Sequence, residues 1–156
     1  MKIIFAGGRD FRDIEIANTI LMDAYENNFV TDECIGISGT AKGADSIFAY
    51  LINNYGGEVI PYPAKWDDLI ETESNPVNIK INKFEKEYNS LAGFNRNKLM
   101  AVNSDKLVAV YKGSGGTKDM INLMIKLNKP VRIYNYCGDF IGKNLKDLKL
   151  WKLHCN

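Results

Sequence analysis

Short apolar runs rich in β-branched residues alternate with stretches of helical periodicity along most of the chain. This alternation is typical of a parallel sheet, because parallel strands need crossover connections and are covered by helices on both faces. Five runs fit buried strands, at residues 2–6, 33–38, 58–62, 106–111 and 130–134. The pattern predicts an α/β fold, specifically a Rossmann-like three-layer α/β/α sandwich with a mostly parallel five-stranded sheet.

Helices are expected between these strands, at residues 13–27, 44–55, 89–103 and 117–127. In the first of them Ile16, Ile20 and Ala24 recur at helical spacing, and Asp13 is placed to cap the N-terminus. Right-handed crossovers in a doubly wound sheet favour the strand order 3-2-1-4-5. With 156 residues, 46% of them hydrophobic, the chain is expected to form one domain, residues 1–156, around one core.

Two segments depart from the alternation. Residues 66–88 are polar, rich in Asn, Glu and Lys, and contain Pro76, which interrupts a long helix. We interpret this stretch as an inserted loop or lid, with a disordered surface insertion as the alternative. Residues 137–156 form a C-terminal extension whose leucines and Trp151 are expected to pack on the outside of the sheet or on a second subunit. A homo-oligomer is expected on this ground.

The charge and the histidine content argue against several classes of function. A formal net charge of +1 provides no global field that would attract duplex nucleic acid or an anionic membrane. The single histidine, His154, lies close to the C-terminus, so a zinc site or a Ser-His-Asp triad lacks its usual residues. We therefore expect no metal and no certain cofactor other than a nucleotide-type ligand.

The cysteines and the hydropathy pattern predict a cytoplasmic protein. Cys34, Cys137 and Cys155 are odd in number and form no C-x-x-C pair, which fits reduced thiols better than a disulfide framework. The apolar run at residues 3–6 is shorter than the core of a signal peptide. No run approaches the roughly 18 apolar residues typical of a membrane span, so the protein is expected to be soluble.

Glycine-rich segments follow three of the predicted strands directly, at residues 7–10, 38–45 and 113–117. Because the carboxyl ends of parallel strands open on one edge of a sheet, these segments are expected to meet there. Glycine lets backbone N–H groups approach an anion closely, and helices starting near Gly43 and Thr117 add unpaired N–H groups. Arg9 and Lys42 supply positive charge. The alternative is that each segment is only a tight turn.

Familiar phosphate fingerprints are absent, because no segment reads G-x-x-x-x-G-K-[ST] and residues 113–118 fail G-x-G-x-x-G at its last position.

Two further residues are candidates for the same edge of the sheet. Arg96 precedes Met100 by four residues, so the two share a helix face, with Met100 in the core and Arg96 over the cleft; the alternative for Arg96 is an ordinary surface salt bridge. Trp66 either stacks on a base or is buried under the following loop.

At these segments the sequence resembles the SLOG superfamily of Rossmann-like proteins, and most closely its YspA-like branch. The matching motifs occur in order, at residues 4–11, 38–45, 63–66, 92–100 and 113–117, within a span of roughly residues 3–135. The resemblance implies a sheet that binds nucleotides or nucleotide-derived ligands. It also implies that the loops at residues 7–9 and 113–117 lie at the phosphate and ribose.

Relatives in this superfamily include the LOG phosphoribohydrolases, which release a base from a nucleoside monophosphate. The resemblance implies a catalytic arginine followed four residues later by methionine, which Arg96 and Met100 match. It also implies a glutamate three residues after a Gly-Thr pair, but Met120 stands there and Asp119 is one position early. One position on a helix is a rotation of about 100°, so Asp119 would need a shifted backbone to act there. Asp10 and Asp45 are the alternative carboxylates.

Three functions are compared on this basis. The first is binding, sensing or sequestering of a nucleotide or nucleotide-derived phosphate ligand. The alternative is a nucleoside 5′-monophosphate N-glycosidase with Arg96 and Asp119 as catalytic residues. The third is a single-stranded DNA module by analogy with DprA, which the near-neutral charge disfavours, so nucleic acid is not an expected partner. The candidate ligand-binding residues are Gly7, Gly8, Arg9, Ser38, Gly39, Thr40, Lys42, Gly43, Asp45, Trp66, Arg96, Asn97, Gly113, Ser114, Gly115, Gly116 and Thr117.

Overall fold

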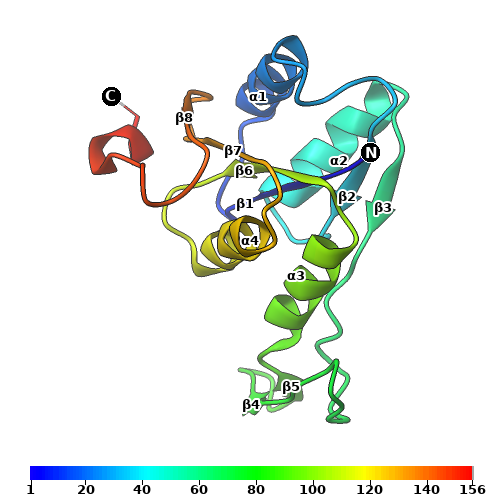
Figure 1. The fold of residues 1–156 in the computed structure, drawn as a ribbon. Coiled ribbons are helices and arrows are strands. Elements are labelled where there is room, and N and C mark those ends of the chain that lie inside the picture. Colours follow the sequence, from blue (N-terminus) through cyan, green and yellow to red (C-terminus); the bar gives the residue numbers. More distant parts are fainter. Residues whose placement is uncertain (156) are drawn as a thin grey trace.

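The central sheet has six strands within residues 1–155, the part of the chain that the computed structural model describes (Figure 1). In spatial order they are β3 (Val59–Pro61), β2 (Ile35–Ser38), β1 (Lys2–Gly7), β6 (Lys106–Val110), β7 (Val131–Tyr134) and β8 (Phe140–Gly142). The first five are parallel to one another. The predicted α/β class and the order of the five predicted strands are therefore confirmed.

Helices cover both faces of this sheet (Figure 1). One face carries α1 (Ile14–Glu26) and α2 (Ala44–Asn54), and the other carries α3 (Ala92–Val102) and α4 (Gly115–Lys126). The alternation of side chains along β1 explains the two cores, since Ile3 and Phe5 pack with α1 and α2 while Ile4 and Ala6 pack with α3 and α4. No helix among residues 1–155 combines the length and apolar character needed to cross a membrane.

The helix boundaries follow local chemistry. Asp13 caps α1 as predicted, because its Oδ1 accepts the N–H groups of Glu15 and Ile16 at 3.0 Å each. The start of α4 lies at Gly115 instead of the expected residue 117, and α3 starts at Ala92 instead of residue 89. The earlier start of α4 brings its N-terminus close to the end of β6.

The sixth strand corrects the expectation of five. β8 comes from the C-terminal extension and pairs antiparallel with β7 at the edge of the sheet. The chain reverses at a tight turn in which Asn135 Oδ1 accepts the N–H groups of Cys137 and Asp139, at 2.9 and 3.0 Å, and Gly138 has a φ of +88°. A three-residue strand that follows such a turn has too short a pattern to be recognised in the sequence.

The rest of the C-terminal extension lies partly on the sheet and partly in solvent. Leu145, Leu148 and Leu153 pack against the core on the α3 and α4 side. The short 3₁₀ helix η1 (Leu150–Leu153) leaves Leu150 and Trp151 exposed. The expected packing of the extension on the sheet therefore holds for only some of its apolar side chains.

The cysteine prediction was wrong for two of the three residues. Cys137 and Cys155 form a disulfide, with Cα atoms 5.6 Å apart, while Cys34 is free and half-buried. The turn after β7 and the return of η1 bring the two cysteines together from a sequence separation of 18. An odd number of cysteines is compatible with one pair and one free thiol, and the absence of a short C-x-x-C motif does not exclude a pair that the fold brings together.

The polar insertion, expected as a loop or lid, is not irregular throughout, and its role as a lid stays a prediction. It contains a hairpin of β4 (Ile79–Ile81) and β5 (Glu87–Asn89), which lies beyond the start of α3 (Figure 1). Asn89 is fully buried, and its Oδ1 accepts the N–H groups of Asn78 and Leu91 at 3.1 Å each, while its Nδ2 donates to the Pro76 carbonyl at 3.1 Å. One amide side chain thus satisfies backbone groups where the segment lacks an apolar core.

Candidate functional site

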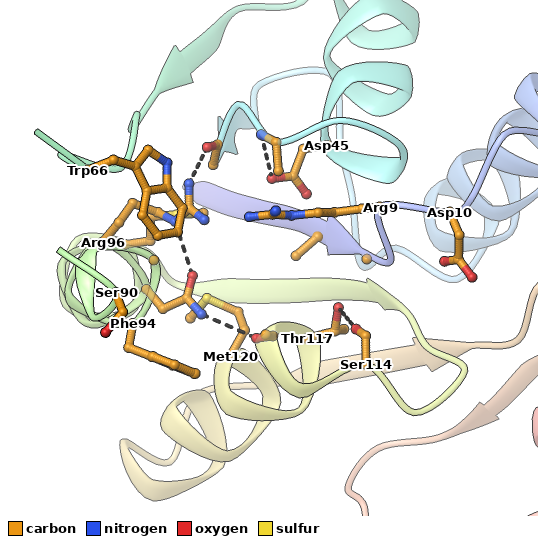
Figure 2. A pocket seen from close by; sticks show the side chains of 18 residues that line it. Arg9, Asp10, Asp45, Trp66, Ser90, Phe94, Arg96, Ser114, Thr117 and Met120 are labelled. Carbon is orange, nitrogen blue, oxygen red and sulfur yellow. Dashed lines mark hydrogen bonds between the residues drawn. The ribbon is translucent and has the colours of Figure 1, made fainter. Parts of the chain in front are cut away.

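A cavity of about 510 Å³ opens at the edge of the sheet where the parallel strands end (Figure 2). Gly7 is the last residue of β1, Gly39 follows β2, and Gly116 belongs to the first turn of α4 after β6; all three line the cavity. The parallel order β2-β1-β6 places these loops next to one another. The structure therefore brings together three segments that are far apart in the sequence, as expected from the strand order.

The candidate residues divide into those on the cavity wall and those behind it. On the wall are Gly7, Arg9, Gly39, Asp45, Trp66, Arg96, Asn97, Ser114, Gly116 and Thr117. Gly8, Ser38, Thr40, Lys42, Gly43, Gly113, Gly115 and Asp119 do not line it. Several of the latter support the wall, since Ser38 Oγ accepts the Thr40 N–H at 3.1 Å and Gly43 packs on the backbone of Gly8 and Arg9. Lys42 is exposed.

Arg96 connects α3 to the ends of two strands. Its Nη1 donates to the carbonyl oxygen of Gly39 and, at 3.3 Å, to that of Tyr62, and its Nε donates to Asn97 Oδ1 at 3.2 Å. Burial lowers the pKa of Arg96 from its ordinary value, and the nearby carboxylate of Asp45 acts in the opposite direction. The guanidinium is therefore a fixed cation with most of its donors already engaged.

Asp45 is a buried carboxyl group in the cavity wall. It lies in the first turn of α2 and is 6% exposed. Burial raises the pKa of Asp45 to about 6, although the Ala41 N–H, which donates to Oδ2 at 3.3 Å, and the charge of Arg96 both lower it. Asp45 therefore changes its charge close to physiological pH.

Gly39 lies where Arg96 and Asp45 meet. A Cβ at this position would lie 2.8 Å from both Arg96 Nη1 and Asp45 Oδ2. The next residue, Thr40, has a φ of +61°, a conformation that β-branched residues rarely adopt. The loop after β2 is therefore held in an unfavourable backbone conformation beside the cavity.

The N-terminus of α4 provides free donors on the opposite wall. Ser114 is the N-cap but makes no side-chain capping bond, because its Oγ donates to Thr117 Oγ1 at 2.8 Å. The N–H groups of Gly115, Gly116 and Thr117 belong to the first turn, where a helix offers them no partner of its own. Together with the positive end of the helix dipole, they suit an anion.

Asp119 lies outside the cavity, whereas Met120 lines it. The Asp119 Oδ2 accepts a hydrogen bond from Asn97 Nδ2 at 3.0 Å, and the same amide donates to the Gly116 carbonyl at 3.2 Å. The one-position offset noted in the sequence thus places a thioether where the LOG motif implies a glutamate. Met100 is buried on the α3 face, as predicted, and a catalytic role for Asp119 stays a prediction.

Arg9 and Trp66 form another part of the wall. Arg9 is exposed, and its Cζ lies 5.9 Å from the centroid of the Trp66 ring. Neither of the two ion pairs within residues 1–155 involves Arg9. Trp66 is 37% exposed and borders the cavity, so it is not buried under the insertion. A cation and an aromatic face are therefore available side by side.

Several residues of this wall were not predicted from the sequence. Ser90, Gly93 and Phe94 line the cavity from the end of the insertion and from α3. Phe94 and Gly93 belong to a motif already noted, but Ser90 carried no signal. At the rim, Tyr136 donates a hydrogen bond to Asp10, which holds the pKa of Asp10 below its ordinary value. The described residues, 1–155, contain no group of three or more His, Cys, Asp or Glu side chains suited to a metal ion.

Comparison with known proteins supports the fold. No protein-family model and no curated protein sequence matches the chain. Among solved structures the chain is similar to DNA processing protein A (DprA) from Streptococcus pneumoniae, with a TM-score of 0.60 and 17% sequence identity. The match covers 94% of this chain and 52% of the DprA chain, so this chain spans about half the length of that structure. The likeness shows a DprA-like Rossmann-type fold.

Replacing Asp45 by Asn is expected to change how stability depends on pH. The pKa of Asp45 is about 6 in the folded protein against an ordinary 3.8, so the folded state binds this proton more tightly than the unfolded state. The free energy of unfolding therefore falls as pH rises from about 4 to about 6. Above pH 6 it is lower by up to about 3 kcal/mol than below pH 4, as far as Asp45 is concerned. Asp45→Asn removes this loss, and urea unfolding of the ligand-free protein at several pH values measures it.

The matched control is Asp67→Asn, because Asp67 forms an exposed ion pair with Lys86 and such pairs contribute little. This control should follow the wild-type pH profile. The raised pKa of Asp45 would be contradicted if Asp45→Asn were less stable than wild type at pH 7 and if its free energy of unfolding changed with pH between about 4 and about 6 as steeply as that of wild type.

Adding a methyl group at Gly39 is expected to destabilise the protein by about 1–3 kcal/mol, since the new Cβ overlaps Arg96 and Asp45. Thermal or urea unfolding of Gly39→Ala measures the loss. The control is Gly115→Ala, where an added Cβ meets no atom within 4 Å and stability should stay equal or rise slightly. Equal stabilities of the two variants would show that Arg96 and Asp45 do not pack as closely against Gly39 as the structure indicates.

Proposed function

We propose that the cavity binds a nucleotide or nucleotide-derived phosphate ligand, which the protein senses or sequesters. One observation carries this proposal: a cation, an unpaired helix N-terminus and an aromatic ring surround a single cavity of about 510 Å³. That volume lies within the range of about 300–1,000 Å³ typical of small-molecule sites. The combination suits a ligand that has a phosphate at one end and an aromatic group at the other.

The phosphate end is assigned to α4. The first turn of that helix offers N–H groups without helical partners, and Ser114 and Thr117 place hydroxyl groups beside them. Gly116 has no neighbouring atom within 4 Å of an added Cβ, so the backbone is open to close approach. Arg9 and Arg96 add positive charge to the same cavity.

The resemblance to the SLOG superfamily supports the same assignment, because its motifs coincide with the loops that line the cavity. The structural likeness to DprA, whose name describes a DNA-processing protein, raises single-stranded DNA as a competing ligand. The formal net charge of +1 argues against this ligand, because binding of a nucleic-acid backbone normally uses a basic track. A mononucleotide-sized ligand is therefore preferred.

A nucleoside 5′-monophosphate N-glycosidase is the second candidate, and Asp45 is the observation that favours it. This carboxyl group is buried, lines the cavity and has a pKa raised to about 6, as is common for groups at functional sites. An ionised Asp45 would stabilise positive charge that develops on a ribose ring during cleavage of the glycosidic bond. Asp119 is less suited, because it lies outside the cavity and accepts a hydrogen bond from Asn97.

Nucleoside monophosphates are expected to stabilise the protein against heat. At a concentration 100-fold above Kd, a ligand that binds only the folded state adds about 2.7 kcal/mol, which raises Tm by about 5–10 °C in a chain of this size. Arg9→Ala should weaken binding about 10- to 100-fold, since it removes a charge-assisted contact. Differential scanning fluorimetry and calorimetric titration measure the two effects.

Lys98→Ala is the matched control, because Lys98 is an exposed cation on α3 that does not line the cavity. It should bind as the wild type does. No change in Tm with any nucleotide, combined with tight binding of a single-stranded oligonucleotide, would replace the proposal with the DprA-like function.

The glycosidase is tested by chromatography of the same mixtures. An active enzyme releases free base, and Asp45→Asn should reduce the rate at least about 100-fold if the carboxylate stabilises the transition state. Binding without base release supports the sensing or sequestering function, whereas base release that survives in Asp45→Asn would remove Asp45 from the mechanism.

A further inference from the structure

We infer that the cavity holds the base of its ligand by stacking on Trp66, without reading the base edges, so that the ligand class is nucleoside monophosphates irrespective of base. This inference rests on the proposed function and names the part of the ligand that each wall contacts. It follows from three observations: the fixed position of the Trp66 ring, the arrangement of the two ends of the cavity, and the hydrogen bonds that Ser90 and Asn97 already make to protein groups.

The Trp66 ring is held in place by the insertion and by α3. The Trp66 carbonyl accepts the N–H of Asn89 at 2.8 Å, and Asn89 is the buried residue that orders the hairpin. The Tyr88 ring meets the indole edge-on with centroids 6.4 Å apart. A Cβ on Gly93 would lie 3.3 Å from Trp66 Cη2, so glycine lets the ring approach the helix. A ring fixed in this way loses little freedom when a ligand stacks on it.

The two ends of the cavity differ in chemistry (Figure 2). Trp66 and Phe94 lie at the end next to α3, and Phe94 is 43% exposed. Ser114 lies toward the other end, at the start of α4. A ligand with its phosphate at α4 therefore extends its base toward the two aromatic side chains. Arg9 reaches across toward Trp66, where its guanidinium can remain beside a stacked base.

Two polar side chains that line the cavity near the aromatic end, Ser90 and Asn97, are already paired with protein groups. Ser90 Oγ donates to the Asn78 carbonyl at 2.9 Å and accepts from Asn78 Nδ2 at 3.0 Å. The Asn97 amide donates to Gly116 and Asp119, and its oxygen accepts from Arg96. A hydroxyl has one donor and an amide two, so neither side chain keeps a donor for a base edge.

Base recognition at this end is therefore limited to the π face. Stacking tolerates all bases, because each has a π face, and it increases with ring area. Adenine and guanine should bind alike, and both should bind more tightly than uracil. Discrimination between adenine and guanine requires hydrogen bonds to their edges, and neither Ser90 nor Asn97 keeps a donor for them. The Arg9 guanidinium lies over the Trp66 ring, 5.9 Å from its centroid, so it is placed toward the face of a stacked base instead of its edge.

Trp66 itself provides the readout. The sequence has two tryptophans, and the other, Trp151, is exposed on η1 outside this cavity. In Trp151→Phe the tryptophan fluorescence comes from Trp66 alone. The full-length variant is titrated with adenosine, guanosine and uridine 5′-monophosphates and with ribose 5-phosphate, which has the same phosphate and sugar but no base; calorimetry gives each Kd independently of fluorescence.

The two purine nucleotides are expected to quench Trp66 and to bind within about threefold of each other. Ribose 5-phosphate should bind about 5- to 150-fold more weakly, the range that corresponds to stacking of one base on an aromatic side chain, and should leave the fluorescence unchanged. In the calorimetric titrations, Trp66→Leu should reduce nucleotide affinity to that of ribose 5-phosphate without changing the affinity for ribose 5-phosphate itself. Trp66→Phe, which keeps an aromatic face, should retain most of the nucleotide affinity.

Several results would overturn the inference, and they differ from failure of the proposed function. Ribose 5-phosphate that binds as tightly as the nucleotides would remove the stacking subsite while leaving the phosphate site in place. A preference above about 30-fold for guanosine over adenosine monophosphate, or the reverse, would show hydrogen-bond reading of the base. If none of the four compounds binds, the proposed function fails and the base subsite fails with it.

Discussion

Arg96 reaches from α3 to the carbonyl oxygens of Gly39 and Tyr62, which lie just beyond the ends of two neighbouring strands. This guanidinium keeps the loop after β2 close to α3, and it lies beside the buried carboxyl group of Asp45. The absence of a side chain at Gly39 makes the approach feasible. Without this junction the cavity would lose the side formed by the loop after β2, so the shape of the site depends on it.

The polar groups of the cavity fall into two kinds, those that are paired within the protein and those that are available to a ligand. Arg96 and Asn97 direct most of their hydrogen bonds to other groups of the protein, and these bonds hold the cavity walls in place. Arg9 and the first turn of α4 are still available to a ligand. Asp45 combines the two roles. Its carboxylate accepts a hydrogen bond from the loop after β2, and its pKa is close to 6, so its charge still changes with pH. The site can therefore remain rigid and still offer positive charge to an anion.

The sequence predicted the parts of the molecule that depend on regular patterns. The five parallel strands and their order followed from buried apolar runs, and the meeting of Gly7, Gly39 and Gly116 followed from that order. Features that depend on single tertiary hydrogen bonds or on distant pairing were missed. The hairpin ordered by Asn89, the strand after the Asn135 turn and the disulfide between Cys137 and Cys155 have no periodic signal. Ser90 and Phe94 joined the site only through the packing of α3 and the insertion.

The central claim is that an anionic ligand occupies the edge where the parallel strands end. Amide NMR of ¹⁵N-labelled protein titrated with a nucleoside monophosphate tests it directly. The account predicts the largest shifts at the N–H groups of Gly39, Gly115, Gly116 and Thr117 and at the Trp66 indole. Shifts centred instead on the second cavity, which lies toward the opposite edge of the sheet and is lined by Tyr25, Cys34 and Tyr55 among others, would contradict it.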